Sequence, residues 1–334
     1  MRRAQLVLLM LILTACGGAC TAVPVPRPDA TDLRFSPSIQ PVVPHEARWG
    51  IYRLRLDTNA VDLVFSSPIA IASLGVNSRG DRFIFSQKAE GGGDATEEIY
   101  TLSTDGSDLR RITTNTFWDL YPVWSPDGSR VAFLSQRAAS LGIYLMNADG
   151  GEVGMLQDSS SHEADIDWRG EQIVYTRDNS IWVVQSDGTG VRRLTNPPRA
   201  GEWGNANLPF GDYDPRLSPD GTQVVFERLV GDQAAHGNYD FFSFDMVTSK
   251  ETRLTRSGYS QGLASWSRSG TQLAYIVAAI GEAGQYDIYT MSADGTKSQN
   301  VTPAFFPSEF LCHSVAFSDD DAVVYFIGEW WPSG

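Results

Sequence analysis

Apolar and polar residues alternate from about residue 47 onward in runs too short for helices, and two phrases recur. The first phrase is a strand, a tight turn and a second strand, as in "VWSPDGSRVAFLS" from Val123 and "SWSRSGTQLAYIV" from Ser265. A period of two flanking Pro, Asp and Gly predicts β-hairpins. Further copies begin at Gly75, Ile166, Arg216 and Ala316.

The second phrase is one strand that enters an Asp-Gly turn, as in "IYLMNADG" from Ile143 and "IYTMSADG" from Ile288. A short strand such as "LRRITT" usually follows it. The other copies begin at Ile51, Ile99, Ile181 and Phe241. No helical periodicity of useful length interrupts the alternation of the two phrases, so the chain is predicted to be all-β.

The turn positions of the first phrase are spaced by 48, 42, 51, 49 and 51 residues, at Gly80, Gly128, Gly170, Gly221, Gly270 and Asp321. Four short strands in each unit of about 40–50 residues are typical of a β-propeller. Six copies of each phrase therefore predict a six-bladed β-propeller with four-stranded antiparallel blades over residues 47–331.

The order of the phrases predicts how the ring closes. The repeat region begins with the second phrase alone, residues 51–65, and ends with the first alone, residues 310–328. Separate half-sheets would leave strand edges unpaired. We therefore expect the last blade to take its inner strands from the C-terminus and its outer strands from the N-terminus.

The N-terminus predicts export and a lipid anchor. Arg2 and Arg3 precede an apolar run that ends at Ala15, which suits a signal peptide and is too short to span a bilayer. Leu13-Thr14-Ala15-Cys16 resembles the lipobox of bacterial lipoproteins, which implies removal of residues 1–15 and lipidation of Cys16. The Pro-rich residues 16–46 would then form the lipidated start and tether of a protein on the outer face of a membrane or in the periplasm. An ordinary signal peptide cut elsewhere is the alternative.

The net charge limits the kinds of partner, and the cysteine content limits the kinds of fold. The net charge of −14 becomes −16 without residues 1–15, so nucleic acid is not an expected partner. Cys312 is the one cysteine of the repeat region, which excludes a disulfide framework and suggests a small buried residue. We expect a monomer without a cofactor, whose partner is an envelope protein, a peptide or a glycan.

The motif "DLYPVWSPDG", Asp119 to Gly128, together with "IYLMNADGG", resembles the propeller repeats of the TolB-like family. The resemblance covers about residues 47–331 and implies the propeller fold. Only the second blade has the full motif, because Leu217 replaces the Trp in the fourth. We expect the predicted anchor and tether in place of the α/β domain that precedes the propeller in TolB itself.

Insertions of the predicted blades gather on one face. In a four-stranded meander the two phrase turns lie on one face, and the other connections lie on the opposite face. The long connections are residues 88–97, 196–212, 229–240 and 278–287, all on the second face. Loop growth on one face of a scaffold is typical of a binding face, so we predict binding at the channel mouth on this long-loop face.

The repeat register predicts which side chains surround that mouth. The starts of the innermost strands offer Trp118, Asp119, His162, Glu163, Asp212, Ser260, Gln261 and His313. The ends of the second strands add Gln87, Ser135, Arg177 and Arg228. We predict as ligand-binding residues Trp118, Asp119, His162, Glu163, Arg177, Asp212, Arg228, Gln261 and His313.

Other roles for these residues stay open. Asp119 and Asp212 can instead cap turns or bond a neighbouring backbone. His162, Glu163, Asp212 and His313 could hold a divalent metal, although the His spacing typical of zinc sites is absent. Ser260 lies in a G-x-S-x-G string, but a nucleophile elbow needs a strand-to-helix turn, and a triad would need an oxyanion hole.

The sequence thus favours a non-enzymatic, lipid-anchored binding propeller in the bacterial envelope. One alternative is a metal-dependent enzyme similar to the oligosaccharide lyases that share this fold. A purely structural envelope protein is the other.

Overall fold

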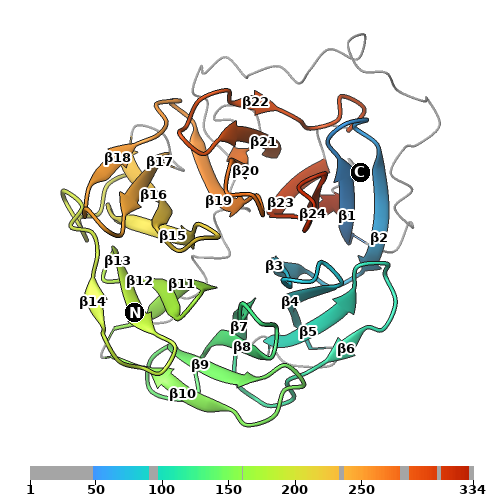
Figure 1. Cartoon of the computed structure of the whole chain (residues 1–334), viewed down its shortest axis with the longest axis horizontal. Coiled ribbons are helices and arrows are strands. Elements are labelled where there is room, and N and C mark those ends of the chain that lie inside the picture. The colour runs from blue at the N-terminus through green and yellow to red at the C-terminus, as the bar shows by residue number, and fades with distance from the viewer. Residues whose placement is uncertain are drawn as a thin grey trace.

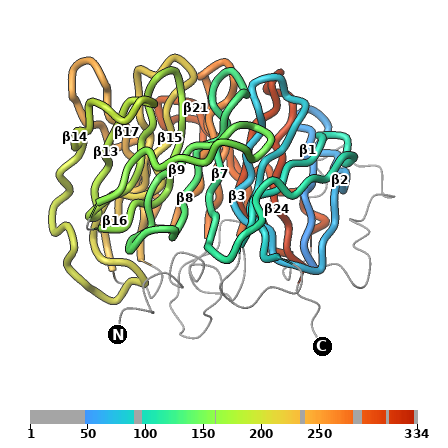
Figure 2. The backbone as a smooth tube through the Cα atoms, turned by 90° about the horizontal axis from the view of Figure 1, so that it is seen from below, coloured from blue at the N-terminus to red at the C-terminus, as the bar shows by residue number. Residues whose placement is uncertain are grey.

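The computed structural model describes residues 48–89, 97–159, 161–232, 237–278, 286–306 and 310–330, and all regular structure in these ranges is β-strand. The sheets are arranged around a central axis, and β3, β7, β11, β15, β19 and β23 lie nearest to it (Figure 1). Seen from the side, the strands run between two opposite faces (Figure 2). Within the described ranges no helix is long and apolar enough to cross a membrane. The predicted signal peptide, Cys16 and the tether lie outside them.

Three four-stranded sheets follow one another along the chain. The first has the order β3-β4-β5-β6, with Ile71–Val76, Arg82–Lys88, Glu97–Ser103 and Arg110–Arg111. The second has the order β10-β9-β8-β7, with β7 to β10 spanning Asp119–Trp124, Arg130–Ser135, Gly142–Asn147 and Gly154–Gln157. The third has the order β11-β12-β13-β14, with Glu163–Arg169, Gln172–Arg177, Ser180–Gln185 and Arg192–Arg193.

The next eight strands form one sheet. Its first half has β15 to β18, Asp212–Leu217, Gln223–Gly231, Asn238–Asp245 and Glu251–Arg253. Its second half has β19 to β22, Ser260–Trp266, Gln272–Ala278, Tyr286–Ser292 and Gln299–Asn300. One parallel pair, Tyr239 with Ser260, joins β17 to β19. The strands are therefore grouped in a way that differs from the expectation of separate four-stranded sheets.

The remaining sheet combines both ends of the described chain. Its order is β2-β1-β24-β23, with β1 and β2 at Trp49–Arg55 and Val61–Ser67 and with β23 and β24 at Phe310–Phe317 and Val323–Trp330. β1 runs antiparallel to β24, and Ile51 lies opposite Ile327. The predicted pairing of the two chain ends is confirmed.

The hydrophobic core lies between neighbouring sheets. One cluster joins Phe83 and Phe85 of β4 to Tyr325 and Ile327 of β24. The rings of Phe83 and Tyr325 meet edge-to-face with their centroids 4.8 Å apart. Cys312 is fully buried in another cluster, as predicted. Because each sheet packs against a neighbour on both faces, strands such as β4 and β8 bury consecutive residues instead of every second one.

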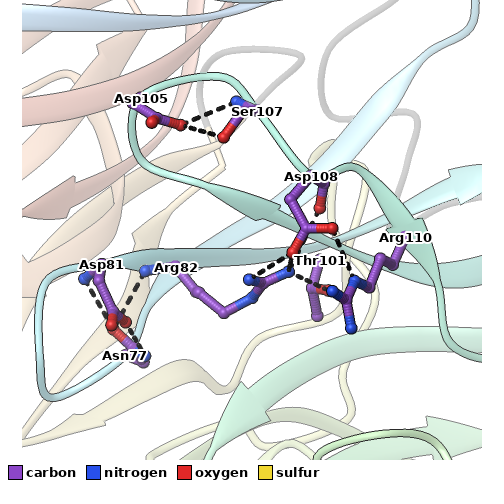
Figure 3. Close-up of polar contacts among 8 residues, drawn as sticks. All are labelled: Asn77, Asp81, Arg82, Thr101, Asp105, Ser107, Asp108 and Arg110. Atoms are coloured by element: carbon purple, nitrogen blue, oxygen red, sulfur yellow. Dashed lines mark hydrogen bonds and ion pairs between the residues drawn. The ribbon is translucent and has the colours of Figure 1, made fainter.

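Short polar contacts hold the tight turns. In the turn after β5, Asp105 accepts hydrogen bonds from the backbone N and the Oγ of Ser107, at 2.9 and 2.6 Å (Figure 3). The same Asx-type contacts recur at Asp127, where bonds from the Ser125 hydroxyl and then from Ser129 lower the pKa to about 2. Both of these turns are thus closed by an aspartate of the turn itself.

Gly150, in the turn between β9 and β10, lets this turn pack on the preceding sheet. Its φ is +92°, and a Cβ there would lie 2.0 Å from the carbonyl oxygen of Ile112, just after β6. Only glycine satisfies both demands without strain. The Gly of the repeated Asp-Gly turn therefore marks a contact between sheets.

Candidate functional site

The predicted residues of the second sheet are engaged in structure. Asp119 is fully buried at the start of β7. Its carboxylate accepts hydrogen bonds from Ser135 Oγ at 2.6 Å and from Asn115 Nδ2 and Arg137 Nη2, both at 2.7 Å. Trp118 precedes it and is partly buried. The Asp119 carboxylate thus makes three hydrogen bonds that fix the start of β7, which fits the structural role given above as an alternative.

The predicted residues of the third sheet are also held locally. Glu163 is fully buried, and Ser159 Oγ donates to its Oε1 at 2.6 Å. Burial raises the pKa of Glu163, and the Ser159 hydrogen bond opposes this. The guanidinium of Arg177 lies 4.7 Å from the Trp182 ring centroid. His162 is exposed, and its Nδ1 accepts from the backbone N of Leu141 at 2.9 Å.

Asp212 and Arg228 form a buried bidentate ion pair. Arg228 donates from Nε to Oδ1 at 2.5 Å and from Nη2 to Oδ2 at 2.8 Å, while its Nη1 lies 2.9 Å from Glu251. Burial raises the pKa of Asp212, and the Arg228 guanidinium opposes this. A bidentate pair of this kind fixes β15 against β16.

The last two predicted residues lie elsewhere on the ring. Gln261 is buried in β19, and no hydrogen bond to its Oε1 is present among the described residues. His313 is stacked against Trp49, with centroids 5.3 Å apart, and its Nε2 lies 3.2 Å from Glu329 Oε2. Ser260 begins β19, so its connector is no strand-to-helix turn. In the described part of the chain no three His, Cys, Asp or Glu side chains are arranged to hold a metal.

A cavity of about 460 Å³ lies at the other end of the channel. All six innermost strands contribute to its wall, through Ser73, Tyr121, Asp165, Arg216, Leu263 and Ser314. Its lining continues to the first residues of the tight turns, such as Ser125 and Arg268. The cavity thus reaches the tight-turn face, and none of the nine predicted ligand-binding residues lines it. Binding on the long-loop face stays a prediction.

A β-bulge in every innermost strand shapes this wall. The strand register shifts once in each, and one residue there has a left-handed φ of 29° to 56°: Ser73, Tyr121, Asp165, Asp214, Leu263 and Ser314. Such backbone is strained for residues other than glycine and clusters at functional sites. Five of these six residues line the cavity.

Around the bulges, backbone N–H groups donate to side chains of the neighbouring sheet or, within the eight-stranded sheet, of its other half. Leu263 N donates to Glu227 Oε1 at 2.6 Å, and Leu217 N donates to Asp167 Oδ2 at 2.8 Å. On the far side Leu74 N donates to Ser314 Oγ at 3.0 Å. These bonds make the wall a continuous, preformed surface.

Aromatic and charged residues surround the cavity mouth. Trp124 and Trp266 lie in its lining, and Trp266 Nε1 donates to the backbone O of Arg216 at 3.0 Å. Asn77 also lines it and is fixed by a bond from its Nδ2 to Asp81 Oδ1 at 2.7 Å (Figure 3). Arg268 and Asp319 are exposed parts of the same lining. Such a polar-rimmed concave site is what ligands of proteins commonly occupy.

Sequence comparison places the repeats in a known group. Residues 45–202 match the family described as the TolB beta propeller domain. A TolB homolog of Chlorobium luteolum is 30% identical over 46% of this chain and 32% of its own length. An uncharacterised protein of Agrobacterium fabrum is 29% identical over 56% of this chain and 61% of its own. The matched stretches therefore span less than two thirds of these relatives.

Solved structures show the same fold. A structure from Agrobacterium tumefaciens that carries the name TolB has a TM-score of 0.65 at 17% identity, over 86% of this chain and 99% of that one. TolB from Acinetobacter baumannii has a TM-score of 0.57 at 18% identity, over 76% and 63%. The fold predicted from the repeats, an all-β TolB-like propeller built of four-stranded antiparallel units, is confirmed.

Proposed function

We propose that this chain, whose residues 45–202 match the TolB beta propeller domain, is a non-enzymatic binding protein that holds part of an envelope protein in its channel cavity. The observation that carries the proposal is the preformed cavity of about 460 Å³ with contributions from all six innermost strands. A large polar-rimmed site is suited to a protruding loop or peptide end.

The proposal includes a six-bladed ring. The two halves of the eight-stranded sheet share a single residue pair, whereas strands within each half pair over several residues. Each half also carries its own bulged inner strand, at Asp214 and Leu263. These features support counting the halves as two blades, with the sheet of β1, β2, β23 and β24 completing the ring.

The proposal also places the protein on a membrane through a lipid on Cys16, with the chain outside the cytoplasm. Leu13-Thr14-Ala15-Cys16 and the Pro-rich segment after it support this location. Replacement of Cys16 by Ser should release the protein into the soluble fraction of lysed cells. Unchanged sedimentation with membranes would contradict the anchor.

Site-specific photo-crosslinking in cells tests the binding proposal. A photoreactive amino acid at Arg268, in the cavity lining, should capture a partner. The same probe at Val247, which is 82% exposed on an outer turn, is the matched control and should not. Trp203, in the long connector between β14 and β15, reports on the long-loop face.

The pattern of crosslinks decides between the two faces. Capture from Arg268 alone supports the cavity as the binding site. Capture from Trp203 alone would overturn the cavity proposal and favour the long-loop face, and capture of glycan instead of protein would change the partner class. An absence of crosslinks at all three positions would favour a purely structural role.

A further inference from the structure

Asp165 lacks the arginine partner that several other buried acids of this protein have. Four buried acids, Glu98, Asp119, Asp212 and Asp240, each have an arginine within hydrogen-bonding distance. Asp165 is 7% exposed and lines the cavity, yet no Lys, Arg or His lies within ion-pair distance of it in the described ranges. Its Oδ2 accepts a long bond, 3.4 Å, from the backbone N of Asp214, and the Thr176 hydroxyl beside it also favours the ionised carboxylate, which lowers the pKa of Asp165.

The nearest arginine is already committed. Arg216 donates from Nε to Ala264 O at 3.1 Å and from Nη1 to Pro215 O at 3.0 Å, and its Nη2 lies 2.5 Å from Asp214 Oδ1. Asp214 Oδ2 is buried without a hydrogen-bond partner among the described residues. The charges of Asp165, Asp214 and Glu227 all act on Arg216, so three carboxyl groups share this one arginine at the wall and behind it.

The pKa values of these carboxyl groups are raised, because they are buried near one another with few cations. Burial, and next the charge of Asp214, raise the pKa of Asp165 to about 6, against the opposing charge of Arg216. The same two causes raise the pKa of Glu227, on β16, well above its usual range. A cation brought into the cavity would stabilise the ionised forms.

Tyr121 supplies an aromatic side chain to the same lining. It is the bulge residue of β7, it lines the cavity, and its pKa is raised by burial and by the charges of Asp165, Glu97 and Asp214. Its hydroxyl therefore stays protonated at neutral pH. An aromatic ring near a carboxylate is a common setting for an organic cation.

We infer that the Asp165 side of the cavity binds an organic cation, the ammonium or guanidinium group of a partner's side chain, with Asp165 as its counter-ion and Tyr121 as its aromatic wall. The inference rests on the proposed binding function and names the chemistry of the group that enters the cavity. The net charge of −14 adds a general attraction for a basic partner.

Binding of the cation should depend on pH. Protons compete with the ligand for Asp165, whose surroundings include Asp214 and Arg216 on β15, Glu227 on β16 and Tyr121 on β7. With a pKa of about 6, roughly one Asp165 in ten is ionised at about pH 5 and nearly all are at about pH 7.5. Affinity should therefore rise about tenfold between these pH values.

Peptide titration of the full-length chain in detergent provides the test. The probes are blocked pentapeptides with a central lysine, arginine or acetyl-lysine between glycines, and binding is measured by calorimetry and by NMR shifts of the Asp165 and Tyr121 amides. Either cationic peptide should bind at millimolar concentration or better, and its arginine or lysine preference identifies the cation. The acetyl-lysine peptide should not bind.

Two variants locate the site. Asp165→Asn conserves volume and should weaken binding at least tenfold, while Asp105→Asn removes the same charge from an exposed turn and should leave it unchanged. Thermal unfolding of both variants checks that each is folded. Equal binding by Asp165→Asn, equal binding of the acetyl-lysine peptide, or no binding of either cationic peptide would overturn the inference. Crosslinks from Arg268 under any of these outcomes would leave the proposed binding function standing.

Discussion

Removal of Arg228 should destabilise the fold by about 3–5 kcal/mol, because it leaves Asp212 as a buried charge without its partner. Asp212 is fully buried and Arg228 is 9% exposed, and two hydrogen bonds join them. The second pair of Arg228, with the half-exposed Glu251, adds about 0–1 kcal/mol. The expected loss is a large fraction of the 5–15 kcal/mol of a typical protein.

The matched variants are Arg228→Met, Asp212→Asn and the double variant of both. Arg228→Met keeps the apolar stem that packs on Phe226 and Phe242. In the double variant no charge is left unpaired, so its loss should be smaller than the sum of the two single losses by about 2 kcal/mol or more. Urea unfolding followed by tryptophan fluorescence measures all four proteins.

The pH dependence gives the same experiment a second readout. Burial already raises the pKa of Asp212, and the Arg228 guanidinium opposes this. Without Arg228 the pKa rises further, so Arg228→Met should lose most stability above that raised pKa and least at acidic pH. A loss under about 1 kcal/mol at pH 7, or a double variant equal to the sum of the singles, would refute the structural role and favour ligand binding at this pair.

Three smaller changes test other parts of the structure. Gly150→Ala should lower the free energy of unfolding by about 2 kcal/mol or more, because the new Cβ would lie 2.0 Å from the Ile112 carbonyl oxygen. Gly128→Ala has no atom within 4 Å of its Cβ and should cost only about 1 kcal/mol of backbone strain. Urea unfolding compares the two variants. Burial raises the pKa of Glu97 to about 7 from 4.5, so its contribution should be lost as pH rises through about 7, and Glu97→Gln should flatten thermal stability between about pH 5 and 8. Hydrogen bonds lower the pKa of Asp127 from 3.8 to about 2, so the wild-type protein should lose the stability that this carboxylate contributes as pH falls from about 4 to about 2. Asp127→Asn should lack this loss, and an acid-unfolding curve identical to that of the wild type would contradict the prediction.

Repetition made the fold predictable. The copies of the first phrase predict the same hairpin, and four copies of the second phrase carry the same Asp-Gly turn, so a weak copy can be recognised from the others. The pairing of Ile51 with Ile327 followed from phrase order alone. The bridge between Tyr239 and Ser260 did not, because a single parallel pair has no pattern in side-chain alternation.

The cavity wall was not predictable in the same way. The repeat register predicted that strand-start residues such as Asp119 and Asp212 surround the channel mouth. Each innermost strand, however, contains a bulge, and the extra residue changes the face to which the side chains after it point. The residues that line the cavity therefore come two positions later, at Tyr121 and Asp165. The available clue was the spacing of D-x-x-P, which sets the bulge just before Pro122 and Pro215.

Residues at the strand starts and residues at the bulges have different roles, and this difference explains how propellers built from the same repeat can bind different ligands. A strand-start acid such as Asp212 is bound to an arginine of its own sheet, so its replacement weakens the fold. A bulge residue lies outside the regular ladder, and its side chain can change at lower cost. Here the bulges are small or apolar at Ser73, Ser314 and Leu263 but aromatic or acidic at Tyr121, Asp165 and Asp214. Tyr121 and Asp165 therefore lie on neighbouring strands on one side of the cavity wall, and a cationic ligand should place its charged group against that side.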